Sequence, residues 1–174
     1  MKEENNFLIR FAGPQDVKAI AALHVTTFME THGAAGPTLE TRQGQWTNLF
    51  QNFDGSWFCI VIEDNNGNLI GFARGQSYDH TDLPDYNGTL NKIYLLREYH
   101  KIGLGKKMLC AVVHEFINRG ISSMVLFGDA SNPSNKFYEA MGGEKLMSDT
   151  GEFHGGYGWK NFDAIVERCK QIHQ

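Results

Sequence analysis

Residues 97–108 read Arg-Glu-Tyr-His-Lys-Ile-Gly-Leu-Gly-Lys-Lys-Met. The residues before them, 89–96, are mostly apolar and bulky, which predicts a buried strand. Residues 103–118 carry apolar side chains three and four positions apart, which is the spacing of an amphipathic helix. Gly103 and Gly105 let a ligand approach the backbone N–H groups of the helix start, and the positive end of a helix attracts anions. The segment therefore predicts a strand, an anion-binding turn and a helix in succession.

The positive charge of the chain is concentrated near this turn. The 174 residues contain 16 Lys and Arg against 20 Asp and Glu, for a net charge of -4. Residues 92–107 hold five basic side chains and one acidic one, a local charge of +4 (5 minus 1). The chain as a whole lacks the basicity typical of nucleic-acid binding, whereas this segment favours a small anion.

Two nucleotide-binding motifs do not fit the turn. A Walker loop requires Ser or Thr after its lysine, and here Lys107 follows Lys106. A dinucleotide-binding Gly-x-Gly-x-x-Gly motif requires glycine where Met108 stands. A Gly-x-Gly pair by itself also fits an ordinary turn into a helix with solvated lysines, so a second signal is needed to assign a ligand.

The rest of the chain alternates strands and helices without a repeat or a linker, which predicts a single domain over residues 1–174. Strands are expected at 7–11, 57–63, 69–78, 89–96, 122–127 and 153–160, and helices at 14–30, 38–49, 103–118, 133–141 and 163–172. Turn signals at 65–68 and at Asn87-Gly88 predict two antiparallel hairpins. A helix connects 89–96 to 122–127, which predicts one parallel pair. The expected fold class is α/β (an α+β mixed sheet), mostly antiparallel, with helices on both faces.

Composition favours an ordinary globular protein, with 41% apolar and 21% charged residues. A chain of this length can bury a large core, so disulfides are not required. The cysteines, Cys59, Cys110 and Cys169, form no Cys-x-x-Cys pair, and Cys110 is expected to be a core residue of its helix. We expect a reducing, cytoplasmic setting and no metal site. The longest apolar run, 57–62, has six residues, which argues against membrane insertion and secretion.

A second motif follows the strand expected at 122–127. Residues 132–143 read Asn-Pro-Ser-Asn-Lys-Phe-Tyr-Glu-Ala-Met-Gly-Gly and open another helix. Together with the strand 90–96 and the loop 100–105, this motif resembles the GNAT superfamily of acetyl-CoA-dependent N-acetyltransferases. The loop, His-Lys-Ile-Gly-Leu-Gly, stands where the family has (Gln/Arg)-x-x-Gly-x-Gly. Two spaced motifs in the expected structural contexts are far more specific than either alone.

The resemblance implies a GNAT-like fold, with acetyl-CoA as co-substrate and no metal. The pantetheine arm would lie where the two parallel strands splay apart, and the N–H of Leu95 would stabilise an oxyanion. Tyr138 would be the general acid that protonates the departing thiolate. Taken alone, Tyr138 also fits a half-buried aromatic residue beside Phe137. The residues implied in cofactor binding are Ile93, Leu95, His100, Lys101, Ile102, Gly103, Leu104, Gly105, Lys106, Asn132 and Asn135.

The resemblance leaves the general base and the acceptor open. Many relatives carry glutamate near the start of the strand 89–96, where this chain has Thr89. The candidate bases are His24, Glu30, His80 and Asp129, although His24 lies on the expected buried face of its helix. The expected reaction is direct attack on acetyl-CoA by a primary amine of a small molecule or a peptide. The alternative is a catalytically weak coenzyme A-binding regulatory or sensor module, and a homodimer stays open as an assembly.

Overall fold

The computed structural model describes residues 6–171 and contains a seven-stranded sheet in the order β1-β2-β3-β4-β5-β7-β6. The strands are β1 (Leu8–Phe11), β2 (Trp57–Glu63), β3 (Leu69–Ser77), β4 (Gly88–Leu95), β5 (Met124–Leu126), β6 (Glu144–Met147) and β7 (Phe153–Trp159). β4 and β5 run parallel, and every other neighbouring pair runs antiparallel. A mostly antiparallel mixed sheet with one parallel pair confirms the fold class expected from the sequence.

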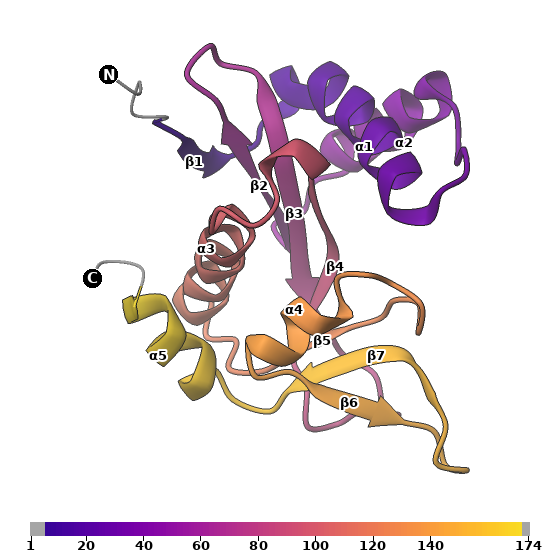
Figure 1. Ribbon diagram of the computed structural model, residues 1–174, viewed down its shortest axis with the longest axis vertical. Coiled ribbons are helices and arrows are strands. Elements are labelled where there is room, and N and C mark those ends of the chain that lie inside the picture. Colours follow the sequence, from indigo (N-terminus) through magenta and orange to yellow (C-terminus); the bar gives the residue numbers. More distant parts are fainter. Residues whose placement is uncertain (1–5, 172–174) are drawn as a thin grey trace.

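Helices cover both faces of this sheet (Figure 1). α1 (Val17–His32) and α2 (Leu39–Gln51) lie on one face, and α3 (Leu104–Asn118) and α5 (Asp163–Lys170) lie on the other. α4 (Asn135–Ala140) follows β5, and two short 3-10 turns, Pro14–Asp16 and Arg97–Tyr99, precede α1 and α3. No helix within residues 6–171 is both long enough and apolar enough to cross a bilayer.

Each face of the sheet has its own apolar core. Phe116 of α3 is fully buried in the core that contains Ile60 and Ile62 of β2. Trp46 of α2 belongs to the opposite core, which contains Val61 of the same strand. Because successive side chains of a strand point to opposite faces, the continuous apolar run of β2 supplies both cores in turn. The two helical layers are therefore attached to one shared sheet.

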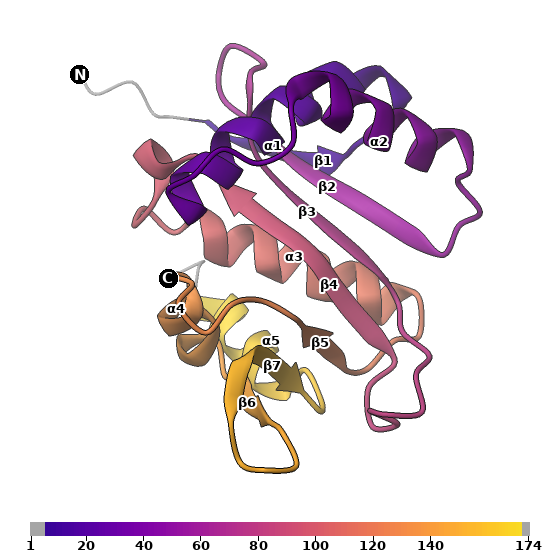
Figure 2. The ribbon, with the colours of Figure 1, turned by 90° about the vertical axis from the view of Figure 1, so that its right-hand side faces the viewer.

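β4 contains one residue more than the segment of β3 that it faces. Arg74 pairs with Lys92 while Gly75 pairs with Leu90, so Asn91 is inserted as a β-bulge. Bulges bend the strand that carries them and increase its twist. β4 shares one register pair with β5, near the start of β4, and the two strands then diverge (Figure 2). The divergence confirms the splayed parallel pair that the resemblance implied.

The hairpin turn expected at 65–68 joins β2 to β3, but the second expected turn differs from the structure. Asn87-Gly88 does not form a tight hairpin, because β3 and β4 are joined by the longer loop 78–87. The side-chain oxygen of Asn87 instead accepts the N–H groups of Ser122 and Ser123 at 3.2 and 3.1 Å, which fastens this loop to the segment before β5. Gly88 permits that close approach, since a Cβ there would lie 2.9 Å from the carbonyl oxygen of Ser123.

The last third of the chain departs from expectation in three places. The edge strand β6 was not expected at all. The helix expected from residue 133 begins at Asn135, because Asn132 Oδ1 accepts the N–H of Ser134 at 2.8 Å in a turn that precedes the helix. The terminal helix ends at Lys170, and residue 172, where it was expected to end, lies outside the described residues.

The structure also joins Cys110 of α3 to Cys169 of α5 in a disulfide, with Cα atoms 5.9 Å apart. The expectation that Cys110 is simply a core residue is therefore wrong. Nothing in the sequence pairs these cysteines, because a sequence separation of 59 gives no indication that the two side chains meet. Cys59 is free and buried, and its burial raises the pKa of the thiol to about 12.

Candidate active site

The turn before α3 has the backbone geometry of an anion site. Gly103 adopts φ +87°, a left-handed conformation, and Lys107 is the first residue whose N–H bonds back into the helix, to the carbonyl of Gly103 at 3.2 Å. The N–H groups between them have no partner within the helix. A Cβ at Gly103 would meet nothing within 4 Å, and one at Gly105 would first meet the ring of Phe137 at 3.7 Å. Space for a ligand is therefore present directly over the first turn.

Within residues 6–171, Lys101 is the only residue other than glycine that has a positive φ, of 64°. A left-handed conformation is strained for a residue with a Cβ, and such strain is typical of functional sites. Its position just before Gly103 places a basic side chain at the same turn.

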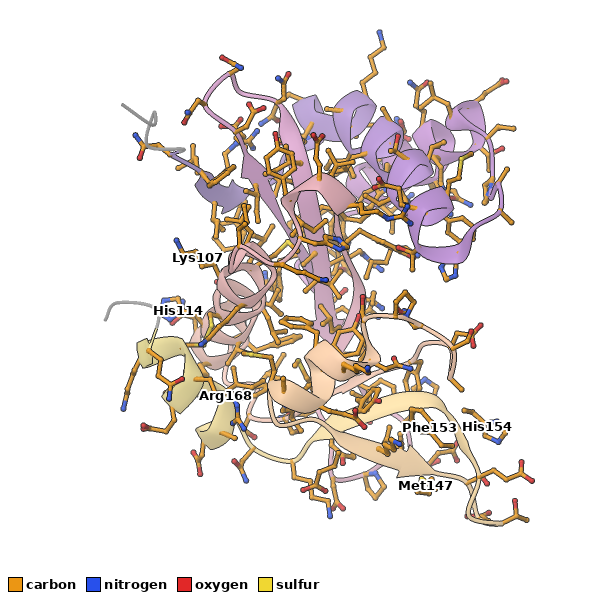
Figure 3. The ribbon with its side chains drawn as sticks, in the orientation of Figure 1. Lys107, His114, Met147, Phe153, His154 and Arg168 are labelled. Carbon is orange, nitrogen blue, oxygen red and sulfur yellow. A yellow bond between two sulfur atoms is a disulfide. The ribbon has the colours of Figure 1, made fainter. Side chains whose placement is uncertain are left out.

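A cavity of about 660 Å³ extends from this turn between β4, α4 and α5. Eight of the residues implied by the resemblance line it, namely Ile93, Leu95, His100, Lys101, Gly103, Gly105, Lys106 and Tyr138. Lys136 of α4 and Arg168 of α5 also line it, and the sequence analysis missed both. Arg168 lies on the side of α5 that faces α4 (Figure 3). The wall of the cavity is thus basic well beyond the turn itself.

Four of the expected cofactor residues lie elsewhere. Ile102 is 57% exposed, and Leu104 is buried in the core under α3. The side-chain amide of Asn135 donates to the carbonyls of Asp129 and Ala130, both at 3.1 Å, and so holds the loop before α4. Asn132 does not line this cavity, although it does line a second one.

The second cavity, of about 410 Å³, opens on the other side of β4. It is formed by the end of α1, residues 91–95 of β4, residues 126–129 at the end of β5 and just after it, and Asn132. Five residues line both cavities: Ile93, Leu95, His100, Ser134 and Tyr138. The two cavities therefore meet at the second half of β4 and at Tyr138.

The backbone of β4 faces this meeting point. The N–H of Leu96 donates to the carbonyl of Ile70 across the sheet at 2.9 Å. Because backbone groups alternate in direction along a strand, those of Leu95 and Ile93 turn away from β3, toward the diverging β5. The Nε2–H of His100 donates to the Leu95 carbonyl at 2.8 Å, which leaves the Leu95 N–H as the donor directed at the junction.

Tyr138 is 4% exposed and packs against the rings of Phe137 and Tyr157. Burial is the main cause that raises the pKa of its hydroxyl above the usual value, with smaller contributions from Tyr94 and Tyr157. The phenol is therefore protonated at neutral pH. It is a hydrogen-bond donor placed where the two cavities join.

The structure places the four candidate bases in different environments. His24 is buried, and its Nδ1 accepts the indole N–H of Trp46 at 3.2 Å. Burial lowers the pKa of His24 to about 3, so it stays neutral and structural, as its helical position predicted. The carboxylate of Glu30 accepts the backbone N–H of Arg97 at 3.1 Å, and neither Glu30 nor His80 lines either of these two cavities.

Asp129 is the candidate that lines the second cavity, where His32 of α1 lies as well. Hydrogen bonds from Ser131 are the main cause that lowers the pKa of Asp129, so its carboxyl is ionised at neutral pH. Its negative charge suits the attraction of an ammonium group. No group of three or more metal-binding side chains occurs between residues 6 and 171.

Comparison with known proteins agrees with this geometry. Residues 17–143 match the family described as the acetyltransferase (GNAT) family. The chain is 28% identical over 171 residues to the uncharacterised N-acetyltransferase YuaI of Bacillus subtilis, with 90% of this chain and 95% of that protein covered.

Solved structures share the fold. The PaiA N-acetyltransferase of Thermoplasma acidophilum, solved with coenzyme A, matches with a TM-score of 0.67 at 17% identity, over 88% of this chain and 98% of that one. A GNAT-family acetyltransferase of Staphylococcus aureus matches with a TM-score of 0.74 at 15% identity, over 91% of this chain and 100% of that one.

Proposed function

Since the chain belongs to the GNAT acetyltransferase family, we propose that it transfers an acetyl group from acetyl-CoA to a primary amine by direct attack. The observation that carries this proposal is the junction of the two cavities at β4 and Tyr138. One cavity begins at a basic turn suited to phosphates, and the other opens to the acceptor side. An acetyl group held at their junction could be reached from the second cavity.

The first cavity fits coenzyme A. The open space over Gly103 and the N–H groups of the first turn of α3 would hold the diphosphate, with Lys101, Lys106 and Arg168 adding positive charge. The backbone groups of Ile93 and Leu95 would pair with the amides of the pantetheine arm. The PaiA relative was solved with coenzyme A, which supports this assignment.

The proposed chemistry forms a C–N bond and breaks the C–S bond of the thioester. The N–H of Leu95 donates to the carbonyl oxygen as it gains negative charge. Tyr138 gives its proton to the sulfur as the thiolate departs, and a phenol kept protonated by burial is in the correct state to do so. The amine must attack in its unprotonated form, so we expect the rate to rise with pH until the amine is free. As the amide forms, the nitrogen releases one further proton to water, and water returns a proton to Tyr138 after the thiol departs.

Tyr138→Phe tests the assignment, because it keeps the ring and deletes the proton donor. We expect the turnover rate, measured by thiol release from acetyl-CoA, to fall by roughly 10²-fold, with unchanged melting temperature and acetyl-CoA affinity. Tyr157→Phe is the matched control, because its ring contacts that of Tyr138 and lines neither cavity. Equal turnover in the two variants would remove Tyr138 from the mechanism.

A coenzyme A-binding sensor is the alternative, and one observation favours it. Thr89 is buried, between Gln76 of β3 and Val125 of β5, where many relatives place a glutamate base. Calorimetry that shows tight acetyl-CoA binding, together with no thiol release across a panel of amines, would establish the sensor and overturn the transferase.

A further inference from the structure

Three basic side chains gather beneath α1 and α2, on the acceptor side of the sheet. Arg74 of β3 and Lys92 of β4 stand opposite each other in the strand register. Arg42 of α2 is 7% exposed and close enough to lower the pKa of Lys92 by its charge. The guanidinium groups lie over aromatic rings, Arg42 at 5.4 Å from the centre of Phe28 and Arg74 at 5.0 Å from that of Trp57. Three separate elements thus bring positive charge to one place.

No carboxylate pairs with this basic cluster in the part of the chain that the structure describes. None of the six ion pairs within 4.0 Å includes any of its members. The Nε atoms of Arg42 and Arg74 are buried without a hydrogen-bond partner. The neighbouring groups stay neutral, because burial lowers the pKa of His24 and raises those of Cys59 and Tyr94. The cluster therefore has three positive charges and no compensating negative one.

Such a cluster costs stability in the free protein. Like charges opposite each other on neighbouring strands repel, and a buried cation without a partner is unfavourable. Burial and the charges of Arg42 and Arg74 together lower the pKa of Lys92. The aromatic faces offset part of the cost. A bound oxyanion would offset more of it, because it supplies negative charge and accepts the free N–H groups.

The second cavity connects the cluster to the reaction site. Lys92 is the member of the cluster that lines this cavity, together with Asn91 and Tyr94, whereas Arg42 and Arg74 adjoin Lys92 and line neither cavity. Leu95 is three residues further along β4, which places it about 10 Å away in an extended strand. The side-chain oxygen of Asn91, next to Lys92 in the lining of the same cavity, is a buried acceptor without a partner among the described residues. A small molecule could therefore reach from the basic cluster to the Leu95–Tyr138 junction.

We propose that the acceptor is an anionic amine: a small molecule with a primary amine and an oxyanion, either carboxylate or phosphate. Lys92 binds the oxyanion, and the charges of Arg74 and Arg42 beside it strengthen the attraction, while the amine lies at the junction of the two cavities. The inference rests on the proposed acetyl transfer and narrows its substrate class. It predicts discrimination against amines that are neutral or that carry a second positive charge.

Matched pairs of acceptors test the inference. β-Alanine is compared with β-alaninamide, and phosphoethanolamine with ethanolamine, as acceptors of the acetyl group of acetyl-CoA at one pH, with kcat/KM calculated from the concentration of free amine. We expect kcat/KM to be roughly 10-fold to 100-fold higher for the anionic member, the range of one or two charge-assisted hydrogen bonds. The better of the two pairs identifies the oxyanion. Equal kcat/KM within both pairs, or a preference for spermidine, would overturn the inference and leave the transferase assignment intact.

Two variants test whether the basic cluster causes the preference for anionic acceptors. Lys92→Gln and Arg74→Gln should each lower kcat/KM for the anionic member about 10-fold and leave that for its neutral twin nearly unchanged. Lys18→Gln removes the same charge from an exposed position of α1 and should change neither. The ligand-free Lys92→Gln protein should also melt at a higher temperature than the wild type, because a repulsive charge is gone. A lower melting temperature together with unchanged discrimination would show that the cluster is structural and would overturn the inference.

A binding measurement separates failure of the inference from failure of the proposed function. With coenzyme A saturating the first cavity, phosphoethanolamine or β-alanine should raise the melting temperature of the wild type but not that of Lys92→Gln. If no amine is acetylated, acetyl transfer fails as the function, and a shift of this kind still supports the anion site. If neutral amines are acetylated and neither anionic ligand shifts the melting temperature, the anion site fails and the transferase stands.

Discussion

At the start of α3, the proposed cofactor site is made chiefly of main-chain groups, namely the N–H groups of the turn at Gly103 and the exposed edge of β4. Beneath α1 and α2, the proposed acceptor site is made of side chains, with Arg42, Arg74 and Lys92 drawn from three elements. The first kind of site depends on local backbone conformation, which a short run of residues specifies. The second depends on how distant parts of the chain pack. The two faces of β4 should therefore respond differently to mutation, pH and reduction.

The largest expected effect concerns the covalent link on the α3 side. The Cys110–Cys169 disulfide closes a loop with a sequence separation of 59, so its loss should lower the free energy of unfolding by roughly 2 to 4 kcal/mol. Urea unfolding with and without dithiothreitol measures this. The Cys110→Ala/Cys169→Ala variant should be as unstable as the reduced wild type and insensitive to the reductant. Coinciding curves for the oxidised and reduced wild type would show that packing alone holds α5.

The next effect belongs to the α1 side and appears in acid. The folded pKa of His24 is about 3, below the usual 6.5, so below pH 6.5 the unfolded chain binds a proton that the folded chain does not. Stability should therefore fall as pH decreases, by about 2 kcal/mol between pH 6.5 and 5. His24→Gln, which can still accept the N–H of Trp46, should lose this slope in urea titrations at several pH values. An unchanged slope would mean that His24 titrates normally.

A smaller effect tests the main-chain site. Gly105 lies inside α3 with ordinary space for a Cβ, so Gly105→Ala should fold and gain about 1 kcal/mol of stability. The added methyl group should hinder approach of the diphosphate and weaken acetyl-CoA binding in calorimetry about 10-fold, as loss of one charge-assisted hydrogen bond would. Gly44→Ala, in the exposed part of α2, should gain the same stability without any weakening of acetyl-CoA binding. Identical affinities in the two variants would place the diphosphate elsewhere.

The smallest effect concerns the strained residue at the same turn. Lys101→Gly removes the strain of a left-handed residue that carries a Cβ and should raise stability by about 1 kcal/mol. Acetyl-CoA binding should weaken a few-fold and depend less on salt, because one positive charge is lost. Thermal melts and calorimetry at two salt concentrations check both. A loss of stability would show that the side chain of Lys101 makes contacts that outweigh the strain.

The contrast between the faces also explains which parts could be predicted from the sequence. The Gly103 and Gly105 spacing, the strand before it and the helix after it form one local unit, so seven of the eleven implied cofactor residues do line the first cavity. The basic cluster was missed as a site because Arg42 and Arg74 read as solvated charges in their own segments. Lys136 and Arg168 were missed for the same reason. Lys92 was counted with the basic segment 92–107, whereas the structure places it in the second cavity, away from the turn.

The remaining errors also have non-local causes. β6 is an edge strand with mostly exposed side chains, so it lacks the apolar alternation that identifies a half-buried strand. Its pairing partner is β7, which follows it, and the Gly142-Gly143 pair obscured its start. Asn87-Gly88 has the composition of a hairpin turn, but the side chain of Asn87 is used to fasten the segment before β5. The disulfide depends on how α5 docks on α3, which no sequence spacing records.

The bulge at Asn91 has a genetic consequence. Side chains of a strand alternate between two faces, much as codons keep a reading frame, and the extra residue shifts this alternation by one position. Lys92 and Tyr94 therefore face α1, and Ile93 and Leu95 face α3. Loss of a single codon there would exchange the two sets of side chains while leaving every other amino acid in place. Substitution at Asn91 alters one side chain, whereas deletion rewrites both halves of the site. The number of residues in β4 should therefore tolerate less change than the identity of any one of them.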